Sequence, residues 1–413
     1  MLSSRDPFEI LPVELRLAII TYLPDLPTLH RLTFASTILL GTCEENSVEC
    51  VSAVIRSMTA DLQQIIRTVT IALTNISTDT NDIDSNVLLK GKVDEEGGHI
   101  ETNEESSIRL PSTLTPKQIR SLLHLSSQIQ IIGQSFLETH LHRINSIEAQ
   151  HLPEGALAFR RDMVFQNYPQ GIAYTPQTTR SISWVEKYRV ERALWRLQLH
   201  AILTPRQTEV RPFDSTQYPT GTFRSPQLAR IYPASIYRAF EGWELDEMQC
   251  VQDHMNEHRL SLQVPVSAEL EYPNPLPTQR KATIPSESPK ETPQWPVLSD
   301  PPTDAIPHAW YQDASAAERP TEPYRMFAAY GTNSPSSPLQ GVDWAIFRRL
   351  GFGIWDLKRM GTMELFTVHQ RQVSGDEGER IRCGAGDNMG LNNILFTWRS
   401  IKLDGKRIVA DGP

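Results

Sequence analysis

The distribution of proline constrains the fold of this chain more than any other feature of its sequence. Of the 30 prolines in 413 residues, 15 lie in the 74 residues from Pro265 to Pro338. Proline lacks a backbone N–H and fixes φ, so a segment this rich in proline nearly excludes regular helices and central strands. We therefore predict that 265–338 is a proline-rich arm or linker and that the regular structure lies on either side of it.

Outside that segment the apolar residues recur at a helical period. Side chains three or four residues apart predict helices, and strictly alternating patterns, which predict strands, are few. The helical stretches run from Pro12 to Pro24, from Pro27 onward, from Pro116 to Leu141, from Ser183 to Leu203, from Glu241 to Leu260 and from Val342 to about Ile401. The sequence thus predicts a mainly α protein.

We expect the chain to divide into four parts. A three-helix unit occupies 6–45, and an irregular multi-helix domain follows at 46–264, with an acidic loop near 78–112. The proline-rich segment 265–338 then leads to a C-terminal helical segment, 339–404, which is expected to pack on the helical domain. The loop is predicted because Asp94 to Glu105 contains six acidic residues and no basic one, so that it repels itself and stays solvated.

Charge and cysteine content exclude several classes of function. The chain has 40 basic and 49 acidic residues, a net charge of −9, which leaves no basic excess for nucleic acid or an anionic membrane. No apolar run approaches the roughly 20 residues of a membrane span. The four cysteines form no CxxC pair and are widely spaced, so we expect free thiols rather than disulfides or a zinc site. These features predict a cytoplasmic or nuclear protein without a cofactor.

One stretch of about 30 residues carries more specific information. From Asp6 to Leu32 it reads DPFEILPVELRLAIITYLPDLPTLHRL, and it resembles the F-box family: a Leu-Pro opening, an amphipathic helix, a Tyr-Leu-Pro stop and a second helix with spaced leucines. The resemblance implies an F-box-like unit that docks on the Skp adaptor of a cullin–RING ubiquitin ligase. The residues expected to bind the adaptor are Leu11, Pro12, Leu15, Ile19, Leu23, Leu29 and Leu32.

The rest of the chain resembles a group of uncharacterised F-box-type proteins of filamentous fungi. Three stretches carry this resemblance: Trp184–Leu199 (WVEKYRVERALWRLQL), Trp243–Asp253 (WELDEMQCVQD) and Gly351–Met360 (GFGIWDLKRM). The two resemblances together imply a substrate-recognition subunit of an SCF-type ligase in ubiquitin-dependent protein degradation. Such a subunit binds an unknown protein target and is not itself an enzyme, so no catalytic residue is expected.

A structural role is the main alternative. The leucines of the first two helices can also pack against the rest of the chain, which would leave a helical structural or interaction protein with a vestigial F-box. After Phe34 the chain lacks the base and the aromatic residue that the family usually carries in its third helix. The two hypotheses differ in burial, because docking requires Leu15 and Ile19 to be partly exposed and a structural role requires them to be covered.

A zinc hydrolase is a third, minor alternative. The run from His254 to His258 has the spacing H-x-x-E-H, in which two histidines on one helix face ligate zinc and Glu257 activates water. The simpler interpretation is a solvated helix end, where cationic side chains suit the helix dipole, and it predicts no metal site. We likewise expect His140 and His142 to be surface residues near the end of the long helix.

Overall fold

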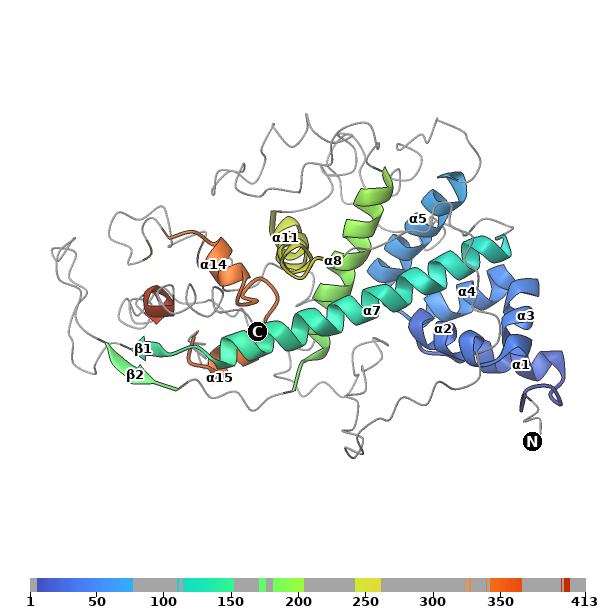
Figure 1. Ribbon diagram of the computed structural model, residues 1–413, viewed down its shortest axis with the longest axis horizontal. Coiled ribbons are helices and arrows are strands. Elements are labelled where there is room, and N and C mark those ends of the chain that lie inside the picture. Colours follow the sequence, from blue (N-terminus) through green and yellow to red (C-terminus); the bar gives the residue numbers. More distant parts are fainter. Residues whose placement is uncertain are drawn as a thin grey trace, which may run out of the picture. The chain divides into compact units, whose positions relative to one another are not determined.

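The computed structural model describes residues 6–76, 114–151, 171–175, 181–203, 242–260 and 342–365, with 110, 323, 327, 339, 395 and 397–401. This part of the chain is mainly α, as predicted (Figure 1). The acidic stretch from Asp94 to Glu105 and nearly all of 265–338 lie outside the described residues.

Each stretch that the sequence predicts as helical contains at least one helix. The N-terminal ones are α1 (Val13–Thr21), α2 (Leu26–Ala35), α3 (Thr37–Glu45), α4 (Ser47–Arg56) and α5 (Ala60–Ile76). The later ones are α7 (Pro116–Asn145), α8 (Trp184–Leu203), α11 (Gly242–Glu257), α14 (Ala345–Arg348) and α15 (Leu357–Thr362). Two short strands, β1 (Ala149–His151) and β2 (Ile172–Tyr174), pair antiparallel with Ala149 opposite Tyr174.

Local side-chain chemistry explains why several helices begin where they do. Asp25 precedes α2, and its Oδ1 accepts a 2.7 Å hydrogen bond from the backbone N–H of Thr28. Thr115 precedes α7 in a reciprocal arrangement, in which its Oγ1 accepts from the N–H of Gln118 and the Gln118 Oε1 accepts from the N–H of Thr115. Such caps satisfy backbone donors that the first turn of a helix leaves without intrahelical partners.

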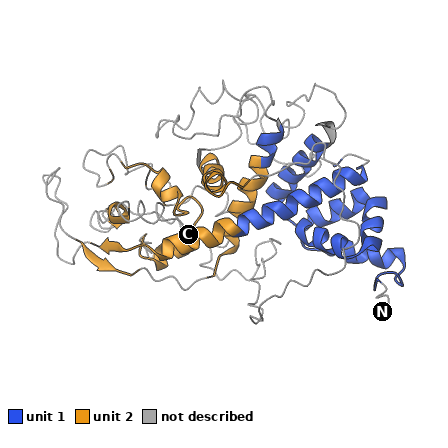
Figure 2. Cartoon of the chain, viewed as in Figure 1, with its two compact units in different colours: residues 1–134, 198–205, 261–300 blue, residues 135–197, 206–260, 301–413 orange. Residues whose placement is uncertain are grey.

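The chain forms two compact units, which Figure 2 shows in different colours. Unit 1 comprises residues 1–134, 198–205 and 261–300, and unit 2 comprises residues 135–197, 206–260 and 301–413. The division falls within α7 and within α8, so each of these helices contributes to both units. Residues 6–45 therefore share one compact unit with α4, α5 and the first part of α7.

Unit 1 has an apolar core between short helices. Both α1 and α2 pack against α3 and α4, and α4 packs against α5. Fully buried side chains come from each of these helices: Ile20, Leu26, Leu29, Leu39, Cys43, Cys50, Val51, Val54, Ile55, Leu62, Ile66 and Val69. Because a helix of nine or ten residues cannot bury its apolar side chains alone, the neighbouring helices complete the core.

Unit 2 has a core of aromatic rings. Residues 342–365 and 395–401 lie far apart in sequence, and the rings of Trp344, Phe347 and Phe352 surround Trp398. The ring centroids of Phe347 and Phe352 each lie 5.1 Å from that of Trp398. Offset and edge-to-face aromatic pairs at such distances add to the stability that burial of the rings provides.

Candidate docking surface

Helix α1 carries apolar side chains on its outer side as well as in the core. Ile20 is fully buried in unit 1, whereas Leu15 on the same helix is 51% exposed and Ile19 is partly exposed. Just before α1, the Ile10 side chain is 83% exposed. Exposed apolar residues that gather in one short segment, rather than being scattered singly, are typical of a binding surface.

The seven residues assigned to adaptor binding fall into three groups. Pro12 and Leu15 are exposed; the second group, which is partly exposed, consists of Leu11, Ile19, Leu23 and Leu32. Leu29 is fully buried, on the side of α2 that also buries Leu26 and Thr33. The Leu29 side chain is therefore placed to hold α2 on the core rather than to contact a partner.

Two exposed aromatic residues in this region were not among the predicted site residues. Tyr22, at the C-terminal end of α1, is 88% exposed, and Phe34, near the end of α2, is 62% exposed. Phe34 lies five residues after the buried Leu29 and directly after the buried Thr33, and these two spacings place it on a different side of α2 from both residues. Tyr22 belongs to the Tyr-Leu-Pro stop of the motif, where the chain leaves the helix.

Hydrogen bonds hold the segment before α1 against the start of α3. The Ser36 hydroxyl donates to Asp6 Oδ2 at 2.6 Å. The Ser36 Oγ also caps α3, because it accepts a hydrogen bond from the backbone N–H of Leu39. The Ser36 hydroxyl and the backbone N–H of Phe8 hold the pKa of Asp6 below its usual value. On α1, the Arg16 Nε donates to the backbone oxygen of Leu11 at 2.9 Å. The segment 6–11 that leads into α1 is thus held at Asp6 by Ser36 and at Leu11 by Arg16.

Two histidines bring α2 and α7 together within unit 1. The ring centroids of His30 and His124 lie 6.1 Å apart, and the His30 ring also lies 6.4 Å from that of Phe34. Burial lowers the pKa of His30, and the charges of His124 and Arg31 lower it further. His30 is therefore neutral at pH 7, and the contact between the two helices carries no imidazolium repulsion.

The H-x-x-E-H run does not form a metal centre among the residues that the structure describes. The carboxylate of its glutamate, Glu257, accepts hydrogen bonds from both terminal guanidinium nitrogens of Arg143, and NH1 lies 3.1 Å from Oε2. The Nε2 of His254 lies 3.4 Å from the Ser135 hydroxyl. No group of three or more His, Cys, Asp and Glu in the described ranges is arranged to hold a metal ion.

Burial in this histidine region corrects two expectations. His254 is buried rather than solvated, and burial lowers its pKa to about 3. His142 is exposed, as expected, but His140 is buried, and its Nδ1 lies 2.8 Å from the backbone oxygen of Phe136. The surface assignment of His140 was wrong because the side of α7 that carries it packs against α11, where the His140 and His254 rings lie 5.3 Å apart.

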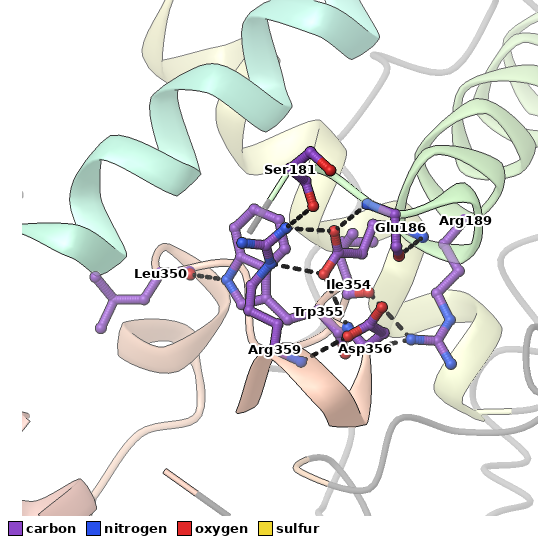
Figure 3. Close-up of polar contacts among 9 residues, drawn as sticks. Ser181, Glu186, Arg189, Leu350, Ile354, Trp355, Asp356 and Arg359 are labelled. Atoms are coloured by element: carbon purple, nitrogen blue, oxygen red, sulfur yellow. Dashed lines mark hydrogen bonds and ion pairs between the residues drawn. The ribbon is translucent and has the colours of Figure 1, made fainter. Parts of the chain in front are cut away.

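Residues of α8, of α11 and of the segment 351–360 meet in the core of unit 2, where their charged side chains pair with one another. Figure 3 shows Glu186 of α8 between several donors. Its carboxylate accepts from the Arg359 Nε at 2.7 Å and NH2 at 2.8 Å, and from the backbone N–H groups of Ser183 and Asp356. Glu186 is 0% exposed, and these four donors compensate for its loss of water.

Helices α8 and α11 are joined by further ion pairs. Both oxygens of Glu247 accept from the Arg192 NH2, at 2.7 and 3.0 Å, and Arg196 pairs with Glu244 at 2.6 Å. Burial raises the pKa of Glu247, and the charges of Arg192 and Arg189 oppose that effect. Charged residues three or four apart within an otherwise apolar helix are a sequence signal for buried ion pairs, but they do not identify the partner on the other element.

Glycines allow the third stretch to lie close to its neighbours. Gly351 has φ +83°, and a Cβ there would lie 2.6 Å from the indole of Trp355. A Cβ on Gly353 would lie 2.8 Å from both Asp246 Oδ2 and Cys250 Sγ of α11. Only a residue without a side chain fits either position, which gives the Gly-Phe-Gly sequence a packing role.

Comparison of the chain with protein-family models, with curated proteins and with solved structures found no match. In the part of the chain that the structure describes, no helix combines the length and the apolar character needed to cross a membrane.

Proposed function

We propose that this chain is the substrate-recognition subunit of an SCF-type ubiquitin ligase, with α1 and α2 as the docking site for the Skp adaptor. The helical remainder holds a protein target, and the chain contributes by positioning that target rather than by catalysis. The proposal rests on the F-box-like sequence from Asp6 to Leu32. Under it, the chain acts in the cytoplasm or the nucleus.

The exposure of Leu15 is the observation that supports docking most directly. At 51% exposed, and next to the partly exposed Ile19, it meets the condition that separates docking from a purely structural role. Ile10, Tyr22 and Phe34, from the same stretch of the chain, are exposed as well. Apolar side chains at helical spacing are what recognition of a helix by a groove or by another helix requires.

Co-purification of the full-length chain with the Skp adaptor tests the proposal. We expect a one-to-one complex with the wild type and at least about a hundredfold weaker binding with the double variant Leu15→Asp, Ile19→Asp, because two apolar contacts are replaced by desolvated charges. Far-UV circular dichroism of the variant checks that the helices remain folded.

Ile131→Asp is the matched control. Ile131 is 65% exposed on α7, outside the motif, so its replacement changes the same surface chemistry and leaves adaptor binding intact. Full binding by the double variant would contradict docking through α1. Absence of a complex with the wild type would instead favour the helical structural protein with a vestigial F-box.

A further inference from the structure

Three imidazole rings gather where the C-terminal part of α7 packs against α11, and all three lie within unit 2. The ring centroids of His140 and His254 lie 5.3 Å apart, and those of His254 and His258 lie 4.4 Å apart. Phe136 stacks on His140 with a centroid distance of 3.9 Å and lies edge-on to His254 at 5.3 Å. His140 and His254 are each 1% exposed, so both rings lie in a largely apolar environment, away from solvent.

The hydrogen bonds of the two buried rings suit neutral imidazoles. The Nδ1 of His140 lies 2.8 Å from the backbone oxygen of Phe136, and because a carbonyl oxygen only accepts, Nδ1 donates and Nε2 is the unprotonated nitrogen. The Nε2 of His254 lies 3.4 Å from the Ser135 hydroxyl, whereas its Nδ1 is buried without a hydrogen-bond partner among the described residues. A doubly protonated His254 ring would therefore bury an N–H group that has no acceptor, which is costly.

The charges that face these rings are positive. Arg143 lies three residues after His140 on α7, and its charge disfavours a proton on His140 and on His254, as does the charge of the neighbouring imidazole. Glu257 supplies no compensating charge, because its carboxylate pairs with the Arg143 guanidinium. Burial is the main cause that lowers the pKa of both rings, that of His254 to about 3 and that of His140 well below its usual value.

The same contact connects α7 to two other segments. The Arg143 NH1 lies 3.1 Å from Glu257 Oε2 on α11 and 3.4 Å from the backbone oxygen of Arg349, directly after α14. Asp253, the other acidic residue in the last two turns of α11, pairs with Arg348 at 3.4 Å rather than with a histidine. Separation of α7 from α11 would thus place the histidines in water and break the pairing of Arg143 with Glu257.

We propose that the contact between α7 and α11 is a pH-sensitive latch, which neutral His140 and His254 keep closed and which acid opens by protonating both rings. In the open state the rings are solvated and bind protons with the ordinary histidine pKa of about 6.5. Because only the open state binds these protons at pH 5.5, each ring shifts the equilibrium toward opening by about tenfold between pH 7.5 and pH 5.5. The two rings together shift it by about a hundredfold.

Hydrogen–deuterium exchange of the full-length protein at pH 7.5 and pH 5.5, corrected for the intrinsic exchange rate at each pH, tests the latch. We expect the protection of amides in α11 and in residues 135–145 to be about a hundredfold lower at pH 5.5. Protection of α4, which contains no histidine and lies in unit 1, should change by less than about threefold. The latch is independent of adaptor docking, which involves α1 and α2.

Two variants separate the buried rings from other titrating groups. The double variant His140→Gln, His254→Gln should lose the pH response of α11, because glutamine is polar and of similar size but does not titrate. His142→Gln is the matched control. His142 is exposed on the same helix, so this variant should respond to pH as the wild type does.

The proposal is overturned if the protection of α11 in the wild type is the same at the two pH values. It is also overturned if α4 loses protection equally, which would show acid unfolding of the whole chain, or if the double variant keeps the full response. The wild-type comparison of α11 with α4 is sufficient on its own, so the test does not depend on folding of the double variant.

Discussion

The cores of the two units are built by different means. The helices α1 to α4 of unit 1 meet through aliphatic side chains, and apolar residues remain on the outer side, as Leu15 does. In unit 2, α8, α11 and α15 bury ionised groups that pair with one another, as Glu186 does with Arg359. Exposed apolar side chains suit binding to another protein. Buried charged side chains determine which helices pack together, because each one needs a partner of opposite charge.

This difference has an energetic consequence. Removal of one partner of a buried ion pair strands the other charge in an apolar environment, whereas a partly exposed pair regains water when it is broken. We therefore expect unit 2 to be much more sensitive than unit 1 to loss of a single charged group. Seven of the eight tryptophans, all except Trp295, belong to unit 2, so tryptophan fluorescence reports mainly on unit 2.

The largest effect is expected for Glu186→Ala. This change leaves the buried Arg359 guanidinium without its carboxylate partner and removes the hydrogen bond from the Ser183 N–H to the Glu186 carboxylate, so it should lower the free energy of unfolding of unit 2 by about 3 to 5 kcal/mol. Urea unfolding followed by tryptophan fluorescence measures the loss.

The matched control is Glu44→Ala in unit 1. Glu44 pairs with Arg120, whose side chain is 32% exposed, and the expected cost is at most about 1 kcal/mol. Urea unfolding followed by circular dichroism measures it. If Glu186→Ala and Glu44→Ala lower the free energy of unfolding equally, unit 2 is not more sensitive than unit 1 to the loss of a charged group.

A smaller effect is expected for Gly351→Ala. The new residue must adopt a positive φ, and its Cβ would meet the Trp355 indole at 2.6 Å, so we expect a loss of about 2 to 4 kcal/mol. Gly41→Ala in α3 is the control, because a Cβ there meets nothing within 4 Å. In a helix interior that change should stabilise unit 1 by about 0.5 to 1 kcal/mol. Thermal unfolding of both variants shows whether each substitution raises or lowers the melting temperature. An unchanged melting temperature in Gly351→Ala would contradict the close contact between Gly351 and Trp355.

The smallest effect is a dependence on acid that is centred on His254. Its pKa is about 3 in the folded protein and about 6.5 when unfolded, so below pH 6.5 the unfolded chain binds a proton that the native state does not. Stability is therefore complete above pH 6.5 and falls as the pH is lowered toward 3.

Near pH 5.5 the loss from His254 should be about 1.4 kcal/mol relative to pH 7.5. Unfolding by urea at the two pH values measures it. His254→Gln should reduce the difference between the free energies of unfolding at pH 5.5 and pH 7.5. His140, whose pKa burial also lowers, would account for part of what remains. An unchanged pH dependence in the variant would show that His254 is not the titrating group.

Much of the local structure was predictable from particular residues. Pro116 after Thr115 marked the start of the long helix, and the apolar period of Ser183 to Leu203 marked α8. The burial of His140 and Leu29 was not predictable, because periodicity identifies an apolar face without saying which neighbour covers it. The ion pairs of Glu186 and Glu247 were missed for the same reason, since their partners lie on other elements.

The sequence by itself determined the mainly α character of this protein and the positions of most of its helices, because period, caps and prolines act within a few residues of one another. Tertiary structure decided which apolar side chains face outward and which charges pair. Those features depend on contacts between residues far apart in the chain, such as Glu186 and Arg359, and no local rule specifies them.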